Sequence, residues 1–188
     1  MRFSVLIMPL IGLAACSSPE NGEGFVEGRF SVEECRPSGN FEKQDFRFDA
    51  GYLGTKRFLD TLTLSILENA VELEETDGLL IRLGELDKFW PIQERPFTRS
   101  ISRDPEDVNV SLSLFETCPD RPTLVVVEGQ IEFTEFAVAQ DPEDTGIEEV
   151  LAGTLTATVV AADGKTIAGT IRSEFNYRPE RLSITEPR

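Results

Sequence analysis

The stretch DTLTLSI at residues 60–66 alternates strictly between polar and apolar side chains. A period of two residues is typical of a β-strand with one buried face. The same alternation recurs in DFRFD at residues 45–49 and in VNVSLSL at residues 108–114. These segments predict half-buried antiparallel strands. The side chains of the first stretch that are expected to point into a core are Leu62, Leu64 and Ile66.

Farther along the chain, TLVVV at residues 123–127 is a continuous apolar run, which favours a central strand. The alternation then resumes at Ile131 and Phe133 and changes parity to Phe136 and Val138. A change of parity inside one strand moves the apolar set to the other face unless an extra residue is inserted. The pattern therefore indicates a β-bulge.

Turn signals separate the strands. Asp163-Gly164 lies between two alternating runs and is the strongest hairpin signal, and Asp77-Gly78 gives a weaker one. Residues 85–90 predict at most one short helical turn. With about nine or ten strands and little helix, the expected fold class is all-β: a single antiparallel β-sandwich or flattened β-barrel.

Leu13-Ala14-Ala15-Cys16 forms a bacterial lipobox directly after a mostly apolar segment of 11 residues. Small residues before a cysteine suit a signal peptidase that cleaves there, and Cys16 then carries acyl chains such as palmitate. A segment of this length is too short to cross about 30 Å of hydrocarbon as a helix, so a signal peptide is expected in place of a membrane span. Two or three acyl chains make a durable membrane anchor.

These signals divide the chain into three parts. Residues 1–15 are the expected lipoprotein signal peptide, residues 16–24 the acylated cysteine and a flexible tether, and residues 25–188 the β domain. Ser17 follows the cysteine, where an aspartate is the usual retention signal for the inner membrane. The expected location is therefore the cell envelope, with the lipid anchor in the outer membrane.

The amino-acid composition argues against several classes of function. The net charge is −16, and loss of Arg2 with the signal peptide lowers it to −17. An acidic surface repels nucleic acid, so no nucleic-acid partner is expected. Histidine is absent, which removes the commonest general base and the most frequent transition-metal ligand. The sequence therefore predicts a protein that is not an enzyme and needs no cofactor.

Cys35 and Cys118 remain once Cys16 is assigned to the anchor. In an oxidising compartment they are expected to form a disulfide that braces the domain, and the alternative is two buried free thiols. A zinc site is not expected, because the chain has no histidine and no further thiol.

Two loops repeat the tetrad DPED, at residues 104–107 and 141–144. Aspartate before proline, with acids following, is typical of the start of a helical turn, and this is the favoured interpretation. Clustered carboxylates also suit a hard cation. The weak candidates for a calcium site are Asp104, Asp107, Asp141 and Asp144.

Two further polar groups are expected to face solvent. Acids gather around the weaker hairpin signal, where a carboxylate-based hydrolase is the less favoured interpretation; they are Glu72, Glu74, Glu75 and Asp77. Hydroxyl groups recur at strand spacing and are expected on outward faces; they are Thr61, Thr63, Ser65, Ser111 and Ser113.

Two groups of motifs resemble those of uncharacterised bacterial lipoproteins with a mainly β mature domain. The first is DAGYLG at residues 49–54, followed by TLTL at 61–64 and ETDGL at 75–79. The second is GQIEF at residues 129–133, with GTLTA at 153–157 and a glycine-to-phenylalanine segment at 169–175. The resemblance implies a lipoprotein with a β fold, and it implies no activity or catalytic residues.

The sequence thus favours a membrane-anchored, non-enzymatic binding or structural module of the cell envelope. Its expected partner is an envelope protein, met by a β face or an edge strand. The alternative is a carrier that holds a small hydrophobic ligand or lipid inside a β-barrel. A carrier needs an open apolar interior of several hundred Å³.

Overall fold

The computed structural model describes residues 21–30, 44–69, 76–86, 96–101, 108–117, 123–138, 149–160 and 167–179. These residues form ten β-strands, and none of them belongs to an α-helix. The strands are β1 (Gly22–Phe30), β2 (Gln44–Asp49), β3 (Tyr52–Phe58), β4 (Thr61–Leu67), β5 (Asp77–Leu83), β6 (Phe97–Ile101), β7 (Val108–Leu114), β8 (Thr123–Ala137), β9 (Val150–Val160) and β10 (Ile167–Tyr177).

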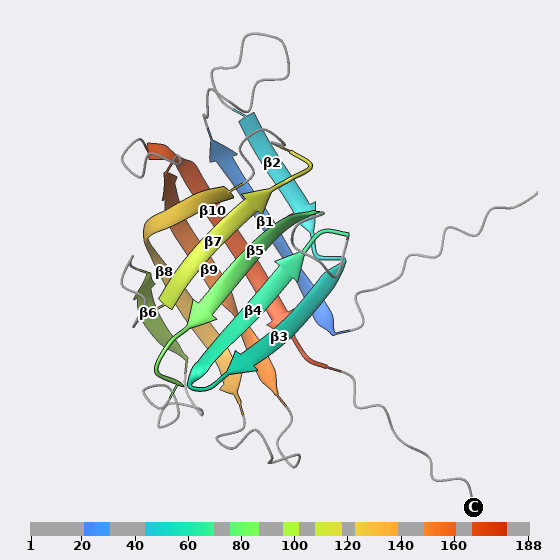
Figure 1. The fold of residues 1–188 in the computed structure, drawn as a ribbon, viewed down its shortest axis with the longest axis vertical. Coiled ribbons are helices and arrows are strands. Elements are labelled where there is room, and N and C mark those ends of the chain that lie inside the picture. Colours follow the sequence, from blue (N-terminus) through green and yellow to red (C-terminus); the bar gives the residue numbers. More distant parts are fainter. Residues whose placement is uncertain are drawn as a thin grey trace, which may run out of the picture.

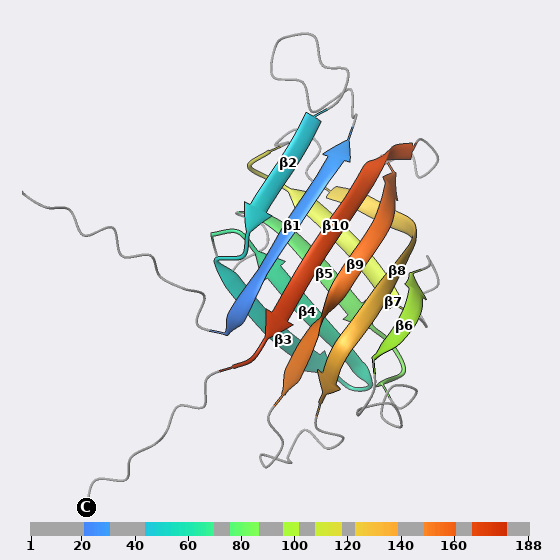
Figure 2. The ribbon, with the colours of Figure 1, turned by 180° about the vertical axis from the view of Figure 1, so that it is seen from behind.

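All ten strands belong to one sheet, in the order β2-β1-β10-β9-β8-β6-β7-β5-β4-β3. Neighbouring strands are antiparallel except β6 and β7, which share a parallel bridge. The sheet curls, so that β3, β4, β5 and β7 lie over β1, β9 and β10 in Figure 1, and the reverse view in Figure 2 shows the other half in front. The all-β expectation is confirmed. Of its two forms, the sandwich of two separate sheets is wrong, because a single sheet curls around its own apolar face.

The longest strand, β8, joins the two halves of the sheet. It pairs with β9 along one edge, while its other edge pairs first with β7 at Ser111–Ser113 and then with β6. Its pairing with β9 shifts register between Val126 and Glu128 and again between Phe133 and Glu135. Each shift inserts an extra residue and increases the local twist. This twist lets the single strand β8 belong to both halves of the curled sheet.

The two edge strands, β2 and β3, meet at one end of the curl. The Ala50 amide donates to the Gly24 carbonyl of β1 (2.8 Å), and the Gly51 amide donates to the Leu67 carbonyl of β4 (2.9 Å). The side-chain amide of Asn21 donates to the Leu53 carbonyl of β3 (3.2 Å). The chain thus crosses from one edge of the sheet to the other through two residues.

The first strand begins inside the segment expected to be a flexible tether. Gly22 pairs with Tyr177 and Gly24 with Phe175, so the tether ends earlier than the expected boundary at residue 24. Gly22 has φ of 125°, and a Cβ there would lie 2.0 Å from the Asn176 carbonyl oxygen. Glycine is therefore present because the backbones approach closely.

The inward face of the sheet is mostly apolar. The predicted inward residues of β2, β4 and β7 are buried, with Leu62, Leu64 and Ile66 at most 1% exposed. The β9–β10 antiparallel pair predicted around Asp163-Gly164 is present. Polar residues of the strands are also buried: Asp77 of β5 and Ser173 of β10 are at most 1% exposed, and Ser113 of β7 is 4% exposed although it was expected to face solvent. It lies between β5 and β8, where it pairs with Gly78 and Thr123.

Aromatic rings fill the core beside the predicted bulge of β8. The Phe133 ring stacks on Phe97 with centroids 5.1 Å apart and meets the edges of Phe136 (5.3 Å) and Phe175 (6.1 Å). The register shift between Phe133 and Glu135 lets both Phe133 and Phe136 point inward. The parity change in the sequence is therefore confirmed as a bulge that adds an aromatic ring to the core.

The hairpin predicted at Asp77-Gly78 is wrong. Both residues belong to β5, and they pair with Leu114 and Ser113 of β7. The Asp77 side chain is 1% exposed and accepts hydrogen bonds from the Glu116 amide (2.8 Å) and the Thr117 amide (3.2 Å). These long-range bonds satisfy a carboxylate that a turn would have exposed to water.

Substitution of Phe133 by alanine is expected to lower the free energy of unfolding by about 3–5 kcal/mol, because it leaves a cavity among three other rings. Urea denaturation measures the change. The matched control is Glu132→Ala on the exposed face of the same strand, which is expected to change stability by less than about 0.5 kcal/mol. Equal losses in the two variants would contradict this description of the core.

Candidate functional site

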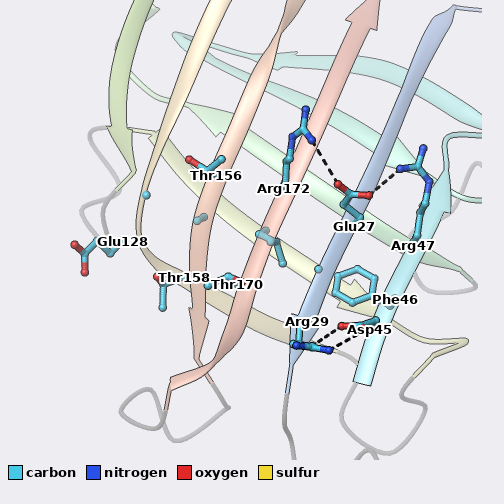
Figure 3. A pocket seen from close by; sticks show the side chains of 14 residues that line it. Glu27, Arg29, Asp45, Phe46, Arg47, Glu128, Thr156, Thr158, Thr170 and Arg172 are labelled. Atoms are coloured by element: carbon cyan, nitrogen blue, oxygen red, sulfur yellow. Dashed lines mark hydrogen bonds and ion pairs between the residues drawn. The ribbon is translucent and has the colours of Figure 1, made fainter. Parts of the chain in front are cut away.

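An open hollow of about 940 Å³ lies on the outward face of the half-sheet formed by β2, β1, β10, β9 and β8. Figure 3 shows charged side chains from β1, β2 and β10 along one side, threonines in the middle and Glu128 on the other side. Because the hollow is lined by Gly28 and Gly129, which have only backbone atoms, it reaches the backbone of β1 and β8. We call this surface the arginine hollow.

The first row of the arginine hollow crosses three strands. The register places Arg47 of β2 opposite Glu27 of β1, and Glu27 opposite Arg172 of β10. Glu27 accepts a hydrogen bond from Arg47 (2.8 Å) and forms an ion pair with Arg172 (3.7 Å), as Figure 3 shows. The two arginines also contact Asp49 (3.0 Å) and Glu174 (3.9 Å), respectively. Opposite charges thus alternate across the strands, which stabilises their pairing.

The second row lies two residues along. Arg29 of β1 holds Asp45 of β2 with two bonds, of 2.6 Å from Nε and 3.2 Å from Nη2. This two-bond arrangement uses the planar fork of a guanidinium, which lysine lacks. The side chains are 60% and 71% exposed, so the pair lies in solvent and contributes little to stability. The two bonds from Asp45 fix the orientation of the Arg29 guanidinium at the surface.

An outward-facing aromatic ring lies beneath the first row. The guanidinium carbon of Arg47 is 4.1 Å from the centroid of the Phe25 ring, and that of Arg172 is 5.7 Å away. Cations over a ring face are attracted by its negative charge density. The hydrogen bond from Arg47 to Glu27 is the largest cause that raises the pKa of Arg47 above its ordinary value.

Three threonines form the floor between the arginines and Glu128. Thr170 of β10 pairs with Thr158 of β9, and Thr158 pairs with Glu128 of β8. Thr156 lies on the same face, opposite Arg172. Their short side chains stand between longer charged ones, and this difference in length makes the hollow. Each hydroxyl both donates and accepts hydrogen bonds.

The arginine hollow is equipped for polar recognition. Its three guanidiniums and its carboxylates balance in charge, although the whole chain carries −16. Guanidiniums supply rigid donor groups, and carboxylates and hydroxyls supply acceptors. Among the described residues that line the hollow there is no cysteine, serine or lysine. The surface can therefore hold a partner through hydrogen bonds and ion pairs.

The interior of the curl is filled where the structure describes it. Core side chains from both halves have no accessible surface, and they include Val26, Leu53, Ile66, Leu79, Ile81, Leu112, Ile131 and Leu155. A side chain that lined a chamber large enough for a ligand would expose part of its surface to that chamber. These residues therefore surround packed atoms.

A second polar cluster lies where β4, β5 and β7 end, away from the arginine hollow. Asp77 accepts from two backbone amides and from the Thr117 hydroxyl. Glu116 accepts from the Asn69 amide (3.2 Å) and the Thr76 hydroxyl (3.3 Å). These contacts close the ends of the strands. Burial, followed by the charges of Glu116 and Asp77, raises the pKa of Glu68 above its ordinary value.

Most residues singled out in the sequence lie outside the described residues. They are Cys16, Cys35, Cys118, Glu72, Glu74, Glu75, Asp104, Asp107, Asp141 and Asp144. The part of the chain with described placement contains no group of three or more acidic or cysteine side chains arranged to hold a metal ion. It also contains no helix of the length and apolar character needed to cross a membrane.

The sequence did not single out the arginine hollow. Arg29, Arg47 and Arg172 sit at ordinary outward positions of alternating strands, and their signal is the alternation of acid and base within each strand. Comparisons with family models, with curated proteins and with solved structures found no match to this chain. The site is therefore described from its own residues.

Substitution of Glu68 by glutamine is expected to stabilise the protein at pH 7. A raised pKa means that the folded state binds the proton more tightly than the unfolded chain, so stability falls as pH rises through the folded pKa. Glutamine cannot ionise, so the variant does not lose this stability as the pH rises. The advantage should disappear below about pH 4, where the carboxyl is protonated in both states.

Urea denaturation at a series of pH values tests this expectation, with the exposed Glu132→Gln as the control. A Glu68→Gln variant that is no more stable than the parent at pH 7 would contradict a pKa of Glu68 raised by burial and by the neighbouring acids.

Proposed function

We propose that this protein is a membrane-anchored, non-enzymatic binding module of the cell envelope that holds a protein partner on the arginine hollow. The observation that carries the proposal is the array of Arg29, Arg47 and Arg172, each engaged by a carboxylate, beside a floor of threonines. Exposed ion pairs contribute little to folding, so stability alone does not account for three of them side by side.

The composition of the arginine hollow suits a protein partner. Arginine and aromatic residues are enriched in protein interfaces, and here Arg47 lies over the exposed face of Phe25. The partner's carboxylates and carbonyls would meet guanidiniums already held in place, which reduces the entropy lost on binding. The rest of this protein is acidic and would repel an acidic partner. The arginine hollow carries no net charge, so an acidic partner can approach it without that repulsion.

The proposed anchor is Cys16, whose lipobox precedes a serine and not the aspartate that retains lipoproteins in the inner membrane. Acylation there would attach the folded domain to the outer membrane. The few residues between Cys16 and the start of β1 at Gly22 would keep the domain next to the bilayer.

Two observations support a binding role over catalysis or ligand transport. The chain has no histidine, and the described acids of the hollow that face arginines are held in ion pairs. The packed side chains inside the curl leave no room beside them for a carried lipid. Both observations support recognition on the outer surface.

Site-specific photo-crosslinking in the producing cell tests the partner. A photoreactive residue at Thr170, on the floor of the hollow, is expected to trap one envelope protein. The same residue at Thr63, on the outward face of β4, is the matched control and should trap none. Replacing Arg47 and Arg172 together by alanine should reduce the Thr170 crosslink by roughly tenfold or more, because arginines often dominate interface energies.

Circular dichroism of the double variant shows whether the fold is retained. A crosslink of equal yield at Thr63, or one unaffected by the loss of both arginines, would contradict binding at the arginine hollow.

Acylation of Cys16 is tested separately. Globomycin, which inhibits the lipoprotein signal peptidase, is expected to cause a precursor that retains residues 1–15 to accumulate, and mass spectrometry of the untreated protein should find acyl chains on Cys16. Normal processing under globomycin would contradict the lipid anchor.

A further inference from the structure

The tip of the β3–β4 hairpin exposes two large apolar side chains. Phe58 is 73% exposed and Leu59 is 77% exposed, and they are the large apolar residues that face solvent within the described part of the chain. They are adjacent and stand at the end of the molecule, where nothing described covers them. Exposed apolar residues gathered at one point mark a contact site more often than scattered ones do.

The turn itself does not require these residues. Phe58 pairs with Thr61, so the hairpin loop consists of Leu59 and Asp60. Leu59 has φ of 54°, a conformation that glycine adopts freely and a bulky side chain adopts at a cost. A leucine kept in this position therefore costs stability, as residues at binding sites often do.

The tip is held in place by its neighbours. The Arg57 Nε donates to the Leu59 carbonyl (3.3 Å), and the amide of Leu86, three residues after β5, donates to the Asp60 carbonyl (3.0 Å). These two hydrogen bonds hold the turn that carries Phe58 and Leu59. The turn would therefore lose little conformational freedom when the two side chains enter a binding surface.

Two cations precede the apolar pair. Lys56 and Arg57 lie on the same strand directly before Phe58, in a chain whose net charge is −16. Long cationic side chains beside an aromatic and an aliphatic residue are typical of segments that enter a membrane interface, where the cations stay among the headgroups. The turn also contains one acid, Asp60, so the residues from Lys56 to Asp60 carry one net positive charge, in contrast to the acidic chain as a whole. A positive charge is attracted to anionic lipids.

The position of the tip relative to the anchor fits the same surface. Asn21, directly before β1, bonds to Leu53 of β3, and Phe58 lies five residues farther along that strand, or about 17 Å. The segment from Cys16 to Asn21 spans at most about 18 Å. Figures 1 and 2 both show the start of β1 and the β3–β4 turn toward the same end of the sheet.

We propose that Phe58 and Leu59 insert into the interface of the lipid bilayer that holds the acylated Cys16. This inference rests on the proposed anchor, and it adds a second point of attachment that orients the domain. Glu27 and Arg29 lie in the second half of β1, so the arginine hollow is farther from the bilayer than the start of this strand. A partner can reach it there.

The test places tryptophan at the tip. The Phe58→Trp variant, with Trp90→Phe to remove the native tryptophan, is prepared as the full acylated chain and reconstituted in phosphatidylcholine vesicles with a minor fraction of phosphatidylglycerol. Its fluorescence is expected to shift to shorter wavelength and to be quenched by brominated lipid. The control is Thr170→Trp in the same background, which should remain unquenched.

A second variant separates insertion from folding. Leu59→Gly relieves the backbone strain, so it should raise the stability of the Phe58→Trp protein while reducing its quenching by lipid. Quenching that is unchanged by this substitution, or equal at Thr170, would overturn the proposal. A wavelength shift without vesicles that grows with protein concentration would overturn it in favour of a second copy as the occupant.

Failure of the anchor is distinguishable from failure of the tip. Mass spectrometry first establishes whether Cys16 is acylated. An acylated, vesicle-bound protein with an unquenched tip overturns the insertion and leaves the anchor intact. If Cys16 carries no acyl chain, the anchor fails, and the unacylated chain is mixed with excess vesicles of the same composition. Quenching then supports the tip alone, and its absence overturns both.

Discussion

The curl of one sheet around its own apolar face is the constraint on which the rest of the structure depends. Ten strands in a flat sheet would leave one side of Leu, Ile, Val and Phe residues in water. Strand β8 allows the sheet to curl. One of its edges pairs first with β7 and then with β6, and its pairing with β9 along the other edge shifts register twice. The core then closes around Phe133, and the edge strands β2 and β3 meet through Ala50 and Gly51.

Among the described residues, the side chains between the two halves of the sheet pack against one another. The two surfaces on which our proposals rest therefore lie on an outward face and at a turn. The arginine hollow lies on the face of one half, and the Phe58-Leu59 tip lies at the end of the other. One surface is polar with balanced charge, and the other is apolar beside two cations. Because they are different in chemistry and in place, they can serve different contacts at the same time.

Much of the fold was predictable because a half-buried strand imposes a period of two on its residues. The alternation at residues 45–49, 60–66 and 108–114 corresponds to β2, β4 and β7, and the parity change after Phe133 corresponds to the bulge of β8. Two local interpretations were wrong for the same reason. Asp77-Gly78 and the glycines before Phe25 have the composition of turns and tethers, yet long-range hydrogen bonds and close strand approach place them inside strands.

The sequence by itself determined which side chains face inward, because that choice depends on residues two positions apart. The lipobox that predicts the anchor and the absence of histidine are also read from the sequence alone. Only the tertiary structure decided that one sheet curls on itself, and that Glu27 lies between Arg47 and Arg172. Glu27 and Arg47 come from consecutive strands, and Arg172 comes from the last strand of the sheet. Their meeting depends on cross-strand register, which the period of a single strand does not specify. The exposure of Phe58 and Leu59 was decided in the same way, because burial depends on what the folded chain places over a side chain.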